Sequence, residues 1–268
     1  MADNARTFPA TLCVGVDPHP TVLEAWGLPD SEAGVAEFVG AIVPLLVEAG
    51  CEVVKPQVAF FERHGVAGMR HLAVLLGDLR SRGIVAVGDA KRGDIGSTME
   101  GYAKGWLTPG SDFEVDYLTV VAYQGLGAVA PALSLAADNG KGVFVLSATS
   151  NPEAALTQSA RRQDGLSVAH GVISDLQAWK AQNPGATQHG VVLGATVSPR
   201  DYGIDLTDYP GMPVLAPGFG FQGASLSDAR GLFPATSPLF AVVARSVLGA
   251  GREGCVEAIR AAKAELGS

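Results

Sequence analysis

The chain has 268 residues, of which 47% are hydrophobic and 17% are charged, and its formal net charge is −8. This length suits one large α/β domain, and we expect a single domain over residues 1–268. The acidic charge argues against general binding to nucleic acid or to an anionic membrane surface. No apolar run reaches the length of a membrane-spanning helix.

Eight short apolar runs recur along the chain and predict buried strands. They are Leu12–Val16, Glu52–Val54, Ile84–Val87, Tyr117–Val121, Val143–Leu146, Val191–Leu193, Pro213–Ala216 and Phe240–Val243. Strands that alternate with helices form right-handed βαβ units with a parallel sheet. Eight such repeats favour closure into a (β/α)8 TIM barrel.

Helical spacing of apolar residues predicts helices between several of these runs. They cover Val35–Ala49, Val66–Leu79, Gly127–Ala137 and Gly254–Leu266. Pro44 predicts a kink or a late start in the first of them. The polar segment Gln158–Gln188 is expected to hold one helix near Gly171–Ala181 between two loops, and Thr196–Pro210 to be irregular.

The cysteines and the N-terminal residues indicate a cytoplasmic protein. Cys13, Cys51 and Cys255 have neither paired nor metal-ligand spacing, so we expect buried, reduced thiols. Residues 1–10 lack the apolar segment of a secretory signal. The five histidines show no paired metal spacing either, so no metal site is predicted.

A lysine stands between two carboxylates in the motif Asp89-Ala90-Lys91-Arg92-Gly93-Asp94, directly after the third predicted strand. A strand projects residues i and i+2 to one side, so Asp89 and Lys91 should share a face. Asp94 then falls on the following loop or first helical turn. The cluster suits proton transfer beside an anionic substrate, although a solvated ion pair on a turn would have the same pattern.

Polar residues also follow other predicted strands, at the barrel rim where this fold carries its active sites. They are Asp17, Lys55, Ser150, Gln222 and Arg245. The glycine-rich segment 217–223, which begins at Pro217, allows backbone N–H groups to approach an oxyanion. Together with Arg245, which can grip a phosphate through two N–H groups, it predicts a phosphate site.

These residues resemble a known family, that of orotidine 5'-phosphate decarboxylase, in its bacterial subgroup with Lys-Pro-Gln after the second strand. The resemblance runs nearly end to end. Its motifs are Leu12–Pro18, Val54–Glu62, Asp89–Thr98, Thr149–Pro152, Ala216–Gly223 and Arg245-Ser246. It implies decarboxylation of orotidine 5'-phosphate to UMP and CO2, the last step of UMP biosynthesis, without a cofactor.

The resemblance also implies a role for each charged residue of the site. Asp17 would bond a ribose hydroxyl, and Lys55 would link the ribose to the charged network. Asp89 would crowd the substrate carboxylate, and Lys91 would protonate the ring carbon after CO2 leaves.

Further roles concern the substrate's base and phosphate and a second subunit. Ser150 would recognise the pyrimidine edge, Gln222 would bridge base and phosphate, and Arg245 with nearby amides would hold the phosphate. Asp94 and Thr98 would reach the site of a neighbouring subunit, which implies a homodimer with shared active sites. Without the resemblance, Thr98 would be only a helix-start residue.

Two other functions remain open on the same barrel. A metal-dependent phosphosugar decarboxylase or aldolase shares the D-x-K-x-x-D motif, but such relatives have an acidic residue where this chain has Lys55. A noncatalytic barrel that binds a phosphorylated metabolite would need no such crowding of charge as Asp89, Lys91 and Asp94 provide.

Overall fold

A computed structural model describes residues 10–267, in which eight parallel strands close into a barrel in chain order. The strands are β1 (Thr11–Val16), β2 (Val53–Pro56), β3 (Val85–Arg92), β4 (Tyr117–Val120), β5 (Gly142–Ala148), β6 (Gly190–Leu193), β7 (Val214–Pro217) and β8 (Leu239–Val243). β8 pairs with β1 and completes the ring. The predicted TIM barrel and all eight predicted strands are confirmed.

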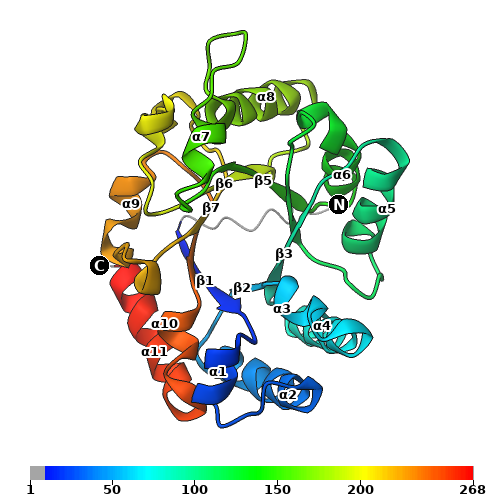
Figure 1. Cartoon of the computed structure of the whole chain (residues 1–268), viewed down its shortest axis with the longest axis vertical. Helices are drawn as coiled ribbons and strands as arrows, with labels where there is room; N and C mark the ends of the chain where they lie inside the picture. The colour runs from blue at the N-terminus through cyan, green and yellow to red at the C-terminus, as the bar shows by residue number, and fades with distance from the viewer. Residues whose placement is uncertain (1–9, 268) are drawn as a thin grey trace.

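Helices surround the strands on the outside (Figure 1). They are α1 (Pro20–Ala25), α2 (Glu32–Glu48), α3 (Ala59–Glu62), α4 (Gly65–Ser81), α5 (Gly96–Leu107), α6 (Leu126–Asp138), α7 (Ala154–Gln158), α8 (Val168–Gln182), α9 (Ala229–Leu232), α10 (Arg245–Leu248) and α11 (Gly251–Leu266). The five predicted helices correspond to α2, α4, α6, α8 and α11. Residues 196–210 hold only two 3₁₀ turns, η1 (Pro199–Tyr202) and η2 (Leu206–Asp208), so the predicted irregular segment is confirmed.

The late start predicted for α2 from Pro44 is wrong. The side chain of Ser31 accepts a hydrogen bond from the Gly34 N–H and caps the helix, which begins at Glu32 and runs past Pro44. Val35, Phe38 and Ile42 are all buried on one face. The packing of this face therefore outweighs the backbone hydrogen bond that a proline removes.

The hydrophobic core has two layers. The larger one lies between the strands and the surrounding helices, and the smaller one fills the barrel interior. In the interior, the rings of Tyr117, Phe144 and Phe240 pack with centroids 5.1–5.8 Å apart. This aromatic layer closes the barrel beneath its carboxyl-terminal rim.

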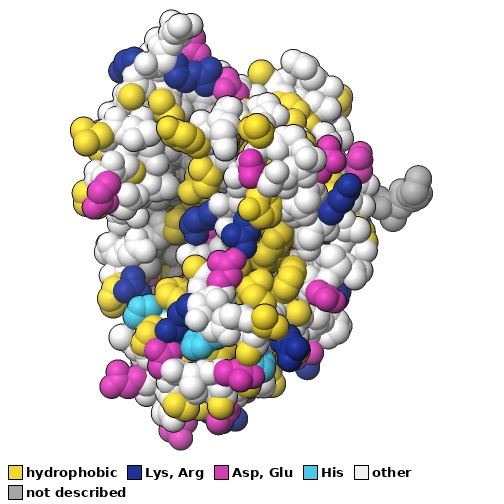
Figure 2. Space-filling model, turned by 45° about the vertical axis from the view of Figure 1, so that its right-hand side comes forward, with side chains coloured by type: hydrophobic (Ala, Val, Ile, Leu, Met, Phe, Trp, Pro, Cys, Tyr) yellow, Lys and Arg dark blue, Asp and Glu magenta, His cyan; other side chains and the backbone are white. Residues whose placement is uncertain are grey.

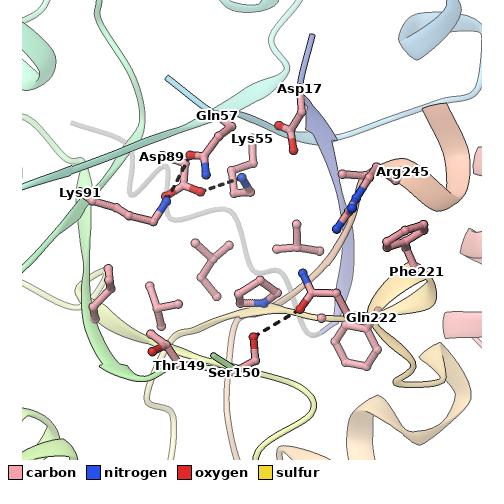
Figure 3. Close-up of a pocket in the computed structure, with 18 residues that line it drawn as sticks. Asp17, Lys55, Gln57, Asp89, Lys91, Thr149, Ser150, Phe221, Gln222 and Arg245 are labelled. Carbon is pink, nitrogen blue, oxygen red and sulfur yellow. Dashed lines mark hydrogen bonds and ion pairs between the residues drawn. The ribbon is translucent and has the colours of Figure 1, made fainter. Parts of the chain in front are cut away.

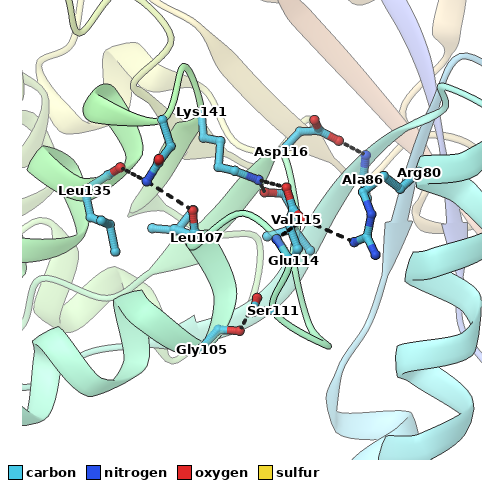
Figure 4. Close-up of polar contacts among 12 residues, drawn as sticks. Arg80, Ala86, Gly105, Leu107, Ser111, Glu114, Val115, Asp116, Leu135 and Lys141 are labelled. Carbon is cyan, nitrogen blue, oxygen red and sulfur yellow. Dashed lines mark hydrogen bonds and ion pairs between the residues drawn. The ribbon is translucent and has the colours of Figure 1, made fainter.

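A polar network holds the opposite, amino-terminal end of the barrel (Figure 4). The ammonium of Lys141 donates to Glu114 Oε1 at 2.9 Å and to the Val115 carbonyl at 2.7 Å. Burial opposes ionisation of Glu114, but the Gly110 N–H and Lys141 hold the pKa of this carboxyl below its usual value. Asp116 accepts a hydrogen bond from the Ala86 N–H at 2.8 Å and so joins the start of β4 to β3.

Cys13, Cys51 and Cys255 are buried and unpaired, as expected. Across the described part of the chain, no helix is long and apolar enough to cross a membrane. The predicted single domain includes residues 1–9 and 268, which lie outside the described residues. The expectation that the chain has no secretory signal rests on residues 1–10, of which 1–9 also lie outside the described residues.

Candidate active site

The carboxyl-terminal ends of the strands surround a cavity of about 260 Å³. The face shown in Figure 2 is hollowed near its middle, where basic and acidic side chains lie beside hydrophobic ones. The polar side chains that line the cavity are Asp17, Lys55, Gln57, Asp89, Lys91, Thr149, Ser150, Gln222 and Arg245. Pro217 lines it as well. Eight of the ten predicted site residues therefore meet in one place.

Asp89 lies between two ammonium groups (Figure 3). Its Oδ2 accepts a hydrogen bond from Lys55 at 2.8 Å, and its Oδ1 accepts one from Lys91 at 2.6 Å. Lys55 and Asp89 are buried, whereas 41% of the Lys91 side chain is exposed. Lys91 is thus the most exposed member of this chain of charges.

The charges in this cluster stabilise one another. Burial by itself would raise the pKa of Asp89, but Lys55 and Lys91 lower it to about 2. Burial would likewise lower the pKa of Lys55, but Asp89 and Asp17 raise it above its usual value. Both groups are therefore charged at neutral pH, which suits a preorganised electrostatic site.

Asp17 supplies an unused hydrogen-bond acceptor. Its Oδ1 is buried and has no hydrogen-bond partner among residues 10–267. Burial raises the pKa of this carboxyl, and Lys55 opposes the rise. A buried acceptor without a donor is costly, so a ligand hydroxyl at this point would satisfy it.

The opposite side of the cavity carries neutral polar groups and one arginine (Figure 3). The Ser150 hydroxyl donates to Gln222 Oε1 at 3.3 Å, which joins the loop after β5 to the loop after β7. Gly220 in this second loop has φ +69°, and a Cβ there would lie 2.6 Å from the Ser246 hydroxyl. The glycine thus lets the β7 loop lie close to the start of α10, where Arg245 stands.

Asp94 and Thr98 are not among the residues that line the cavity of their own chain. Asp94 accepts a hydrogen bond from the Ile95 N–H at 2.8 Å, just before α5. Thr98 is exposed in the first turn of that helix. Their expected place in a neighbouring subunit's site stays a prediction.

Gln57, Thr149 and Phe221 are among the lining residues to which sequence reasoning gave no individual role. Gln57 accepts a hydrogen bond from the Lys91 ammonium at 3.1 Å. It was missed because the second apolar run was ended at Val54, whereas β2 continues to Pro56 and puts Gln57 at the strand end. Thr149 directly follows β5, so the same reading of strand ends could have found it.

The predicted common face of Asp89 and Lys91 is found, but regular strand geometry does not produce it. β3 and β4 shift register between Gly88 and Arg92, and Lys91 adopts φ +48°, a left-handed conformation that is uncommon for lysine. The side chains meet because this bulge redirects Lys91 toward the carboxylate.

No group of three or more His, Cys, Asp or Glu side chains within residues 10–267 is arranged to hold a metal ion. The charged groups at the cavity instead form the ammonium–carboxylate chain and the separate Arg245. Such a site can bind an anion at one side and present an ammonium proton at the other.

Comparison with known proteins gives a consistent picture. The sequence model of the "Orotidine 5'-phosphate decarboxylase / HUMPS family" matches residues 10–262. Orotidine 5'-phosphate decarboxylase of Salinispora tropica is 46% identical over 94% of this chain and 88% of its own length. That of Corynebacterium efficiens is 43% identical over 92% and 88%. A crystal structure described as this decarboxylase, from Streptomyces avermitilis, covers 96% of this chain and 90% of its own, with a TM-score of 0.87 and 40% identity.

Proposed function

Because this chain belongs to the orotidine 5'-phosphate decarboxylase / HUMPS family, we propose that its cavity converts orotidine 5'-phosphate to UMP and CO2 with Lys91 as the proton donor. This is the last step of UMP biosynthesis. The observation that carries the proposal is the half-open ammonium of Lys91, hydrogen-bonded to an ionised Asp89 inside the cavity.

The reaction needs a stabilised carbanion. The bond between the ring carbon and its carboxylate breaks, CO2 leaves, and the electron pair stays on a vinylic carbon that no adjacent carbonyl delocalises. A unit positive charge 4 Å from this carbon would stabilise it by roughly 4 kcal/mol at an effective dielectric constant near 20. Lys91 then transfers its proton to the carbon and takes another from solvent, without help from a cofactor.

Asp89 acts on the substrate carboxylate, whereas Lys91 acts on the ring carbon. Its carboxylate is ionised, and it repels the neighbouring substrate carboxylate. This repulsion ends when neutral CO2 departs and the electron pair passes to the ring carbon. Asp89 also holds the Lys91 ammonium through a 2.6 Å hydrogen bond. Lys55 balances the charge of Asp89 and lies toward Asp17, whose unused oxygen suits a ribose hydroxyl.

The other side of the cavity suits the base and the phosphate. Ser150 and Gln222 offer hydrogen bonds to the pyrimidine edge, and Gln222 also reaches toward the phosphate. Arg245 and the backbone amides of the loop after Pro217 bind the phosphate dianion. Contacts so far from the reacting carbon position the ring and supply binding energy.

The active unit is a homodimer, with Asp94 and Thr98 completing the partner's site. The exposure of Thr98 and of the neighbouring Ile95, which is 60% exposed, supports this assignment. The reaction takes place in the cytoplasm; the three buried, unpaired cysteines fit a reducing compartment. Neither nucleic acid nor a membrane is a partner, in line with the net charge of −8.

An absorbance assay with orotidine 5'-phosphate tests the proposal, in metal-free buffer with and without EDTA. Equal UMP formation in both conditions is expected. Loss of activity in EDTA with recovery on adding Mg²⁺ would favour a metal-dependent barrel enzyme instead. Binding of UMP without any turnover would favour a metabolite-binding protein.

A further inference from the structure

Thr119 of β4 contacts both Asp89 and Lys91, although it is not among the residues that line the cavity. Its side chain is fully buried. Its hydroxyl oxygen lies 2.9 Å from the Lys91 backbone nitrogen and 3.0 Å from Asp89 Oδ1. None of the roles derived above uses this hydroxyl.

The bulge in β3 explains why a side chain is needed at this point. Gly88 pairs with Leu118 and Arg92 with Val120, so Asp89, Ala90 and Lys91 together lie opposite Thr119 alone. The backbone of β4 offers too few hydrogen-bond partners for all three residues at this point, and a buried N–H group without an acceptor costs free energy. The Thr119 hydroxyl takes the place of the missing backbone acceptor for Lys91.

The direction of both hydrogen bonds follows from the chemistry of the groups. The Lys91 N–H can only donate, so the Thr119 oxygen accepts from it. The hydroxyl has a single proton, and the Gly88 carbonyl is farther away, at 3.5 Å, than the ionised Asp89 oxygen at 3.0 Å. The hydroxyl therefore donates to Asp89, since a bond to a charged acceptor is the stronger one.

We propose that Thr119 is a positioning residue for the decarboxylation: its hydroxyl ties the Asp89 carboxylate to the left-handed backbone of Lys91 and so fixes the ammonium relative to the carboxylate. The inference rests on the proposed function. When Lys91 gives its proton to the ring carbon, Asp89 Oδ1 loses the charge of its ammonium partner but keeps the Thr119 hydroxyl. The carboxylate thus stays in place through the proton transfer.

The test uses three substitutions in the full-length protein. Thr119→Val removes the hydroxyl and keeps the shape of the side chain. Thr119→Ala and Thr119→Ser both lack the methyl group and differ from each other in the hydroxyl alone. The last pair keeps the proposal testable if the valine variant does not fold.

We measure kcat and KM for orotidine 5'-phosphate and, by calorimetry, Kd for UMP. Loss of one hydrogen bond to a charged group should lower kcat roughly ten- to a hundredfold in the Val and Ala variants. Kd for UMP should be unchanged, and Thr119→Ser should retain most of the parent kcat. A purely structural role would instead weaken UMP binding and kcat together.

Full kcat in Thr119→Val or Thr119→Ala would overturn the inference, and so would an equal loss of kcat in Thr119→Ser and Thr119→Ala. A parallel loss of UMP affinity and kcat would overturn it too. Failure of the proposed function is distinguishable, because the unmodified protein would then form no UMP in the same assay.

Discussion

The guanidinium of Arg245 lies over the ring of Phe221, with 3.7 Å between Cζ and the ring centroid. Phe221 is nevertheless 63% exposed, which is unusual for so large an apolar side chain. The ring covers one face of the guanidinium and leaves its N–H edge free. The contact therefore holds Arg245, the residue proposed to bind the phosphate, at the cavity before any substrate is bound.

Removing the Phe221 ring should weaken substrate binding without slowing the chemistry. A cation–π contact at an exposed site contributes about 0.5–1 kcal/mol, so Phe221→Ala should raise KM for orotidine 5'-phosphate about two- to fivefold at nearly constant kcat. Arg245→Ala should raise KM far more. Phe221→Leu, which keeps apolar bulk without a ring, should behave like Phe221→Ala, and an unchanged KM in all three variants would remove the phosphate site from this place.

Mixing two inactive variants tests the shared active site. Each proposed site takes Lys91 from one subunit and Asp94 from the other. In a dimer of Lys91→Ala and Asp94→Ala subunits, one site therefore carries both substitutions and the other carries neither. Random mixing should therefore restore about a quarter of the sites of the parent protein, which a steady-state rate would report. A mixture of Lys91→Ala with Asp89→Ala is the matched control and should show no rescue, because both residues belong to the same chain's cavity. Absence of rescue in the first mixture would count against shared sites.

The network at the amino-terminal end of the barrel should matter for stability and not for catalysis. Lys141→Met leaves the largely buried Glu114 carboxylate without its closest cation, and breaking such a pair costs about 3 kcal/mol. Denaturant unfolding should show this loss, while kcat stays at the parent value. Lys104→Met, at a lysine whose side chain is 71% exposed, is the control and should change neither quantity. Equal stability of the two variants would contradict the assignment.

His189 should make the fold less stable in mild acid. Its Nε2 lies 3.0 Å from the Leu133 carbonyl and its Nδ1 accepts from the Val143 N–H at 3.1 Å, so the buried ring is neutral. Burial lowers the pKa of His189 to about 4, against about 6.5 when unfolded. The unfolded chain thus binds more protons between pH 6.5 and 4, and stability falls as the pH falls through this window.

Thermal melts of the parent protein and of His189→Gln across pH 4–7 check this prediction. The glutamine side chain can both donate and accept, so it can replace the two hydrogen bonds without titrating. The parent should lose more stability than the variant as the pH is lowered. Parallel curves would show that another group carries the acid sensitivity.

Much of this fold is readable from the sequence because the strands are buried on both faces along most of their length, so that each begins as a short apolar run. The site was predictable for a related reason, since polar residues that follow such runs must meet at one rim. A helix start near Thr98 was anticipated, but the extent of α5 was not predicted, because Gly96, Gly101 and Gly105 weaken its helical pattern.

The details of the charged cluster were not predictable in the same way. The bulge that redirects Lys91 depends on pairing with β4, which is distant in sequence. Thr119 stands within the apolar run Tyr117–Val121, where nothing marks its hydroxyl as a partner of Asp89. Contacts of this kind are visible only once the strands are placed side by side.

The most direct test of the account is UMP formation by Lys91→Met, which replaces the ammonium by an uncharged side chain of similar length. Loss of a general acid and of its charge should lower kcat by at least about 10²–10⁴-fold, while calorimetry still detects UMP binding. Lys104→Met provides the same chemical change at an exposed position. A Lys91→Met protein that forms UMP at the parent rate would contradict the central claim that this ammonium protonates the ring carbon.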